Sequence, residues 1–211
     1  MNRVRKSQPM MLMIGSSLNR NQKALTSRRA GVLITLFAVL SSAAHGQTLD
    51  GNLKRYAQDG LSFDYAAAWE LSDQSNPAAQ QLVLTEKTLD AQIMIIALRG
   101  AITSPKQEEQ AKAALIEPSI SRLLKQYEIA GINVERSAAT ANVAGSPAEG
   151  ARLRFAVDGQ PGTNDIYWLT INQRVVQLFF ITPEKTASKT TICWDMVRST
   201  LRIEKPTKTK Q

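Results

Sequence analysis

Few residues of this chain could carry chemistry, and the first to consider is its single cysteine, Cys193, in the stretch TTICWDMVRS. A thiol becomes reactive beside a cation or a helix N-terminus, whereas a neighbouring carboxylate such as Asp195 raises its pKa. On a helix, Cys193 shares a face with Val197, and Asp195 lies about 200° away. We therefore interpret Cys193 as a buried, inert residue near the C-terminus of a final helix. A reactive or intermolecularly bonded thiol is the alternative.

The only histidine, His45, lies in a segment that has the order of an export signal. Residues 1–46 contain seven basic and no acidic residues, then the apolar run AGVLITLFAVL, then the small-residue stretch SSAAHGQ. Small side chains at Ala44 and Gly46 predict cleavage before Gln47. The apolar run is shorter than the roughly 20 residues that cross a bilayer, so we expect no stable membrane anchor and a periplasmic or secreted protein. The export route, general or twin-arginine, and the start at Met1, Met10, Met11 or Met13 stay open.

Removal of His45 leaves a mature chain with no histidine and one cysteine. This inventory excludes Ser-His-Asp and Cys-His catalysis, zinc sites built from His and Cys, and an intramolecular disulfide. The sequence also has no glycine-rich phosphate loop and no nucleophile elbow. We therefore expect no catalytic residue, no cofactor and no metal, and we predict that the protein is not an enzyme.

The formal net charge of +8 is concentrated at the two ends of the chain. Seven basic residues fall in 1–46 and three lysines in 205–211, which leaves 16 basic and 18 acidic residues in 47–204. A body this close to neutral lacks the many cationic contacts that binding to nucleic acid requires. A basic patch for an anionic partner could form from Arg152, Arg154, Arg174 and Arg202, but we favour dispersed, solvated arginines.

Acidic and aromatic residues allow three further kinds of site. Glu108 and Glu109 could act as paired acids, but we place them in the first turns of a helix, where the helix dipole favours negative charge. Asp64, Glu70 and Asp73 could hold a hard cation, although their spacing matches no calcium loop. The tryptophans could line a ligand pocket, and for them we favour core packing: Trp69, Trp168 and Trp194.

The hydrophobic pattern predicts strands around one long helix. Leu61, Phe63 and Tyr65 alternate with polar residues after a turn at Asp59-Gly60, whereas AQIMIIALRG (91–100) and VVQLFFIT (175–182) are apolar on both faces. A strand that is apolar on both faces belongs inside a sheet covered on both sides. The order along 144–182 predicts antiparallel hairpins with turns at AGSP, DGQPGTN and Asn172–Arg174.

The long helix is predicted to begin at Ser104 and Pro105, with Gln107 completing a capping box, and to end at Gly131. Its core face comprises Ile116, Ile120, Leu123, Leu124 and Tyr127. Because Pro118 lacks an amide hydrogen, we expect a kink or break near 114–117.

Thr182 and Pro183 are predicted to start the final helix, which a short strand around TLRIE follows. The predicted fold is α+β, a mainly antiparallel sheet with helices packed on both faces. It forms one domain over 47–204, with a lysine-rich tail at 205–211.

These elements resemble the PsbP-like α-β-α sandwich family, which includes the lumenal photosystem II subunit and the bacterial DcrB-type envelope proteins. The resemblance rests on GLSFDYAAAWEL, EGARLRF, the hairpin through NQR and the closing WDMVRSTLRIE, and it covers about Tyr56 to Glu204. Ala66 departs from it, because the family usually has proline there. The resemblance implies an exported helper or partner protein of an envelope assembly, with no catalytic residues to carry over.

The sequence predicts a non-catalytic periplasmic binding or assembly-helper module of the cell envelope with a protein partner, whose oligomeric state is unknown. The alternative is a carrier of a small apolar ligand in a pocket between sheet and helix. A cavity lined by Trp and Ile would favour the carrier, and a solid core with a flat, exposed apolar patch would favour the protein partner.

The charge asymmetry and the small-residue site predict that the exported protein lacks residues 1–46. Intact-mass measurement of periplasmic material should therefore give a chain that starts at Gln47. Recovery of the full-length chain from the cytoplasm would contradict both the processing and the predicted location.

Overall fold

The structure is a computed structural model that describes residues 53–205. The predicted export segment 1–46, the cleavage site before Gln47 and all but the first residue of the predicted tail lie outside the described residues, so they remain predictions. The described chain forms two antiparallel sheets. The smaller has the order β1-β2-β10, with β1 at Leu53–Gln58, β2 at Leu61–Ala66 and β10 at Arg202–Ile203.

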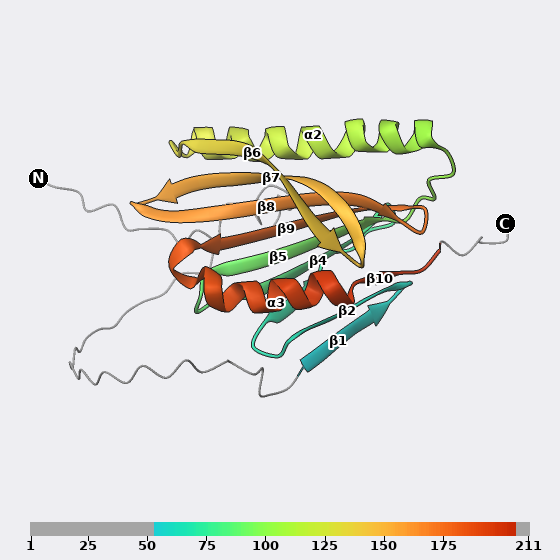
Figure 1. Cartoon of the computed structure of the whole chain (residues 1–211), viewed down its shortest axis with the longest axis horizontal. Helices are drawn as coiled ribbons and strands as arrows, with labels where there is room; N and C mark the ends of the chain where they lie inside the picture. Colours follow the sequence, from blue (N-terminus) through green and yellow to red (C-terminus); the bar gives the residue numbers. More distant parts are fainter. Residues whose placement is uncertain (1–52, 206–211) are drawn as a thin grey trace, which may run out of the picture.

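The larger sheet has seven strands in the order β3-β4-β5-β9-β8-β7-β6. One long helix, α2 (Pro105–Ile129), packs on one face, while α3 (Ala187–Thr200) and the small sheet pack on the other (Figure 1). This arrangement confirms the predicted α+β class, a mainly antiparallel sheet with helices on both faces. The seven strands are β3 (Glu70–Asp73), β4 (Ala79–Glu86), β5 (Ala91–Leu98), β6 (Val134–Val143), β7 (Ser146–Val157), β8 (Gln160–Ile171) and β9 (Arg174–Pro183).

The segments AQIMIIALRG and VVQLFFIT lie inside the sheet as predicted, as β5 and β9, and the structure shows that these two strands pair with each other. All ten residues of β9 are buried. Successive β9 side chains point to opposite faces, so that Phe180 joins the core under α3 and Phe179 the core under α2. Covering both faces of β9 thus requires both layers.

Helix α2 begins and ends as predicted, but it is not broken. Ser104 Oγ accepts a hydrogen bond from the Gln107 amide at 3.3 Å, while the Gln107 side chain accepts from the Thr103 amide at 2.8 Å, one residue earlier than a capping box requires. Gly131 (φ +71°) follows the helix end. The predicted break near 114–117 is wrong, because the helix continues through Pro118. The apolar residues on both sides of Pro118 pack on the sheet and hold the two halves in one helix.

The final helix also begins later than predicted. Thr182 and Pro183 are the last residues of β9 and still pair with β8, and a 3-10 turn, Glu184–Thr186, separates them from α3. The backbone at Pro183 is extended (ψ 143°), which prevents an earlier start of the helix.

Gly150, on β7, provides a test of how tightly neighbouring strands pack. A Cβ atom there would lie only 2.5 Å from Cδ1 of Tyr167 and would also clash with the backbone carbonyl of Ile166. Gly150→Ala should therefore lower the free energy of unfolding by about 1–3 kcal/mol, measured by urea denaturation. The control is Gly100→Ala, because a Cβ at Gly100 meets nothing within 4 Å. Equal stabilities of the two variants would contradict the packing described for β7 and β8.

Candidate functional site

A cavity of about 230 Å³ lies between α2 and the seven-stranded sheet. Its floor comes from β4, β5 and β9, and its wall from one side of α2 between Ala114 and Gln126. Most of the residues that line it are apolar, the kind of lining found in small-molecule sites. The described residues that line the cavity are Gln81, Met94, Ile96, Leu98, Ala114, Leu115, Ile116, Pro118, Ser119, Arg122, Leu123, Gln126, Val175, Gln177 and Phe179.

The floor of the cavity uses the strand face that the sequence marks as apolar. Met94, Ile96 and Leu98 alternate with the residues of β5 that pack under α3. Met94 is 7% exposed, whereas Ile96 and Leu98 are half-buried. The burial of this face therefore decreases from Met94 toward Leu98, where the strand ends.

A short chain of hydrogen bonds ties α2 to the sheet at the middle of the cavity. The Gln177 side-chain amide donates to Ser119 Oγ at 2.8 Å, and the Ser119 hydroxyl donates to the carbonyl of Ile116 at 2.8 Å. Pro118 has no amide hydrogen to offer the carbonyl of Ala114, and both of these residues line the cavity. The bridge fixes the height of the helix above β9 next to the proline.

One cationic side chain, Arg122, lines the cavity among the described residues. It is exposed, and it makes no ion pair or side-chain hydrogen bond with any residue in 53–205. The other polar groups on the wall and floor are neutral: Ser119, Gln126, Gln81 and Gln177. The cavity thus combines an apolar interior with a single positive charge.

The four arginines considered as a basic patch do not form one. Arg152 binds Asp165 through two hydrogen bonds of 2.6 and 2.7 Å, which raise the pKa of Arg152 above its ordinary value. Arg202 is exposed and donates to backbone carbonyls, and Arg154 is exposed on β7. These three agree with dispersed arginines.

Arg174 was wrongly placed among the solvated arginines, because it is only 3% exposed. Its guanidinium donates to the carbonyl of Leu98 at 2.7 Å and to Gln80 Oε1 at 2.5 Å. Burial lowers the pKa of Arg174. Gln80 in turn donates to the carbonyl of Gln58 at 3.0 Å, so this buried arginine connects the large sheet to β1.

The acidic residues considered as a cation site contact separate partners. Asp64 pairs with Arg55 at 3.3 Å, Glu70 with Lys87, and Asp73 accepts from Tyr56 Oη at 3.2 Å. Within residues 53–205, no group of three or more His, Cys, Asp or Glu side chains is arranged to hold a metal ion.

Glu108, in the first turn of α2, accepts a hydrogen bond from Thr170 at 2.9 Å and pairs with Lys112 at 3.3 Å. Glu109 follows it in the same helix. This position at the helix N-terminus agrees with the interpretation that the helix dipole explains the two acidic residues.

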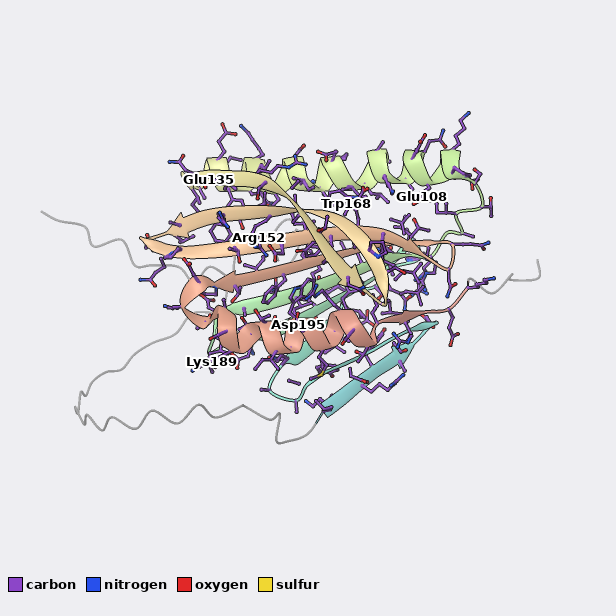
Figure 2. All side chains as sticks on the ribbon, in the orientation of Figure 1. Glu108, Glu135, Arg152, Trp168, Lys189 and Asp195 are labelled. Carbon is purple, nitrogen blue, oxygen red and sulfur yellow. The ribbon has the colours of Figure 1, made fainter. Side chains whose placement is uncertain are left out.

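Two of the three tryptophans pack in the core, and none of the three lines the cavity between α2 and the sheet. Trp69 and Trp194 are 4% and 3% exposed. Trp194 stacks on Phe180 with ring centroids 5.1 Å apart. Trp168 is half-buried on the α2 face of the sheet, and Asp195 lies on α3 at the opposite face (Figure 2). Core packing is confirmed for Trp69 and Trp194, whereas Trp168 packs at the edge of its cluster.

Sequence reasoning did not identify the residues that line the cavity. The strand alternation marks Met94, Ile96 and Leu98 as one face, but it cannot tell whether a helix fills the space above them. One signal was present: Ala114, Pro118, Arg122 and Gln126 recur every four residues, a stripe of small and polar residues beside the core face of the helix.

Within residues 53–205, no helix is both long and apolar enough to span a membrane.

Comparison with known proteins shows no family membership, and it finds solved structures to which the chain is similar. No protein-family model and no curated protein matches the chain. It is similar to the solution structure of cyanobacterial PsbP (CyanoP) from Synechocystis sp. PCC 6803, with 13% identity, a TM-score of 0.46, and coverage of 77% of this chain and 98% of that one. It is also similar to LpqN, involved in cell envelope biogenesis of Mycobacterium tuberculosis, with 13% identity, a TM-score of 0.40, and coverage of 74% and 93%.

Cys193 is 2% exposed and lies in the middle of α3, not near its C-terminus as predicted. Burial raises the pKa of its thiol to about 11, and Asp195 points to solvent, where it pairs with Arg198. The interpretation of Cys193 as a buried core residue is therefore confirmed.

The raised pKa predicts slow labelling of Cys193 by thiol reagents in the folded protein. At pH 8 a pKa of about 11 leaves roughly one thiol in a thousand ionised, and burial restricts access further. Denaturant should make labelling fast. Because the folded pKa is raised, this thiol's contribution to stability is complete below about pH 9 and is lost as the pH rises toward 11. Rapid stoichiometric labelling under native conditions would contradict the interpretation.

Proposed function

We propose that this chain is a non-catalytic binding protein that holds a small apolar ligand in the cavity between α2 and the seven-stranded sheet. The observation that carries the proposal is the cavity itself, with its mainly apolar lining and its volume of about 230 Å³. For comparison, a cavity of about 150 Å³ lined by Leu, Ile and Phe binds benzene in another protein. The space here suits a ligand somewhat larger than one aromatic ring.

The surface supports the ligand carrier over an assembly module with a protein partner. Among residues 53–205, the large hydrophobic side chains that are exposed are Leu53, on β1, and Ile129, at the end of α2. They lie on different elements and form no apolar patch of the size that protein interfaces use. The cavity is lined by Ile, Met and Leu and contains no Trp, so it meets the expectation for a carrier in part.

The export segment predicted at 1–46 supports a location of this activity in the periplasm or outside the cell. A carrier in that compartment would keep an apolar molecule out of water between the membrane and its point of use. That role needs a pocket and no reacting group, which fits a mature chain without histidine.

Octan-1-ol, an uncharged apolar probe, should bind in the cavity and shift the NMR signals of the Met94 and Ile96 methyl groups. Ala114→Trp should weaken binding at least about tenfold, because each buried CH₂ contributes about 0.8 kcal/mol and the indole would exclude two or more of them. The control is Ala113→Trp, the same change at an exposed α2 position that does not line the cavity.

Both variants should unfold at the same urea concentration, which separates loss of binding from loss of the fold. Equal octan-1-ol affinity in the two variants, or an absence of methyl shifts in the original protein, would contradict the proposed function.

A further inference from the structure

We infer that the ligand of the cavity is an apolar molecule with one carboxylate group, and that Arg122 binds this carboxylate. The inference rests on the proposed function and specifies the chemical class of the ligand. Its structural basis is the position of Arg122, a single cation on the wall of a cavity whose other described lining residues are uncharged.

Arg122 lacks the partners that neighbouring cations on the same helix have. Helix positions three and four residues away face the same side, and for Arg122 these are Ser119, Pro118, Lys125 and Gln126, none of them acidic. By contrast, Lys125 pairs with Glu128 at 2.8 Å and Lys112 with Glu108 at 3.3 Å.

Nearby carboxylates are already occupied. Glu117, also on α2, binds Arg136 of β6 at 3.0 Å, and Glu128 binds Lys125. The two carboxylates of α2 nearest to Arg122 therefore already have cationic partners, and within residues 53–205 the guanidinium at the cavity has no anionic partner.

The charged group lies toward the C-terminal end of the part of α2 that lines the cavity. Ala114, Leu115 and Pro118 contribute apolar atoms one to two turns before Arg122, on the same side of the helix. At 1.5 Å per residue, Ala114 and Arg122 are about 12 Å apart along the helix axis. A linear molecule lying along α2 would bury its chain over Ile96 and place its end group at Arg122.

A carboxylate is the end group that this arrangement fits best. The planar guanidinium offers parallel N–H groups that match the two carboxylate oxygens, and its one positive charge balances one negative charge. Gln126, one turn further along, lines the same wall and can donate a further hydrogen bond. The Ser119 hydroxyl is not available as a donor, because it donates to the carbonyl of Ile116.

Octanoate and octan-1-ol, which have chains of equal length, test the inference by calorimetric titration at neutral pH. We expect the original protein to bind octanoate about fivefold more tightly than octan-1-ol, the upper range for an exposed ion pair, and this preference should fall as salt is added. Arg122→Gln should remove the preference, so that the variant binds octanoate and octan-1-ol with equal affinity. The control is Lys106→Gln, which removes one positive charge from the first turn of α2 away from the cavity and should change neither affinity.

The outcomes separate the inference from the proposed function. Equal binding of both probes in the original protein, or an octanoate preference that survives Arg122→Gln, would overturn the role of Arg122 while the cavity remained a binding site. If neither probe bound, the proposed function itself would fail, and the inference with it. Loss of octan-1-ol binding in Arg122→Gln would show that the arginine shapes the cavity and does not recognise charge.

Discussion

The width of the seven-stranded sheet is the constraint from which the rest of the structure follows. Seven strands spaced about 4.8 Å apart span roughly three helix diameters, because a helix with its side chains is about 10 Å across. A single helix, α2, packs on one face, and its buried residues belong to one core cluster that includes Leu153, Phe155 and Ile166 of β7 and β8. The helix therefore leaves space beside it over β4 and β5, and this space is the cavity.

The opposite face of the sheet does not have this uncovered area, because α3 and the small sheet cover it together. Helix α3 packs Trp194 against Phe180, and the small sheet β1-β2-β10 covers the adjoining area. The buried guanidinium of Arg174 and its neighbour Gln80 connect the two sheets through hydrogen bonds to carbonyl groups. A buried charge without an ion-pair partner costs stability unless its N–H groups are hydrogen-bonded. Because the guanidinium of Arg174 has such hydrogen bonds, we assign a structural role to the face of the sheet that α3 and the small sheet cover. Ligand binding and structural support thus fall on different faces of one sheet.

The sequence predicts the parts of this fold that depend on local pattern. Alternation identified β2, the two-sided strands β5 and β9 and the core face of α2, because the periods of strand and helix follow directly from backbone geometry. It could not predict the effect of Pro118 or the burial of Arg174, because both depend on contacts with residues distant in the chain. The sequence could not predict the cavity for the same reason. Its pattern predicts Ile96 and Leu98 as core residues, and they are half-buried only because of where α2 lies across the sheet.

The bridge at Ser119 explains why the helix does not slide across and fill the space. Three contacts along α2 tie it to β8, β9 and β7, respectively: Glu108 to Thr170 at 2.9 Å, Ser119 to Gln177 at 2.8 Å, and the Tyr127 ring to Phe155 with centroids 4.9 Å apart. Moving the helix toward β4 would break two hydrogen bonds to partly buried groups and unstack two aromatic rings, each of which costs free energy. These contacts, spaced along an otherwise apolar interface between α2 and the sheet, therefore hold the helix in place. Because hydrogen bonds are directional, the helix cannot shift without breaking them, and the cavity stays open.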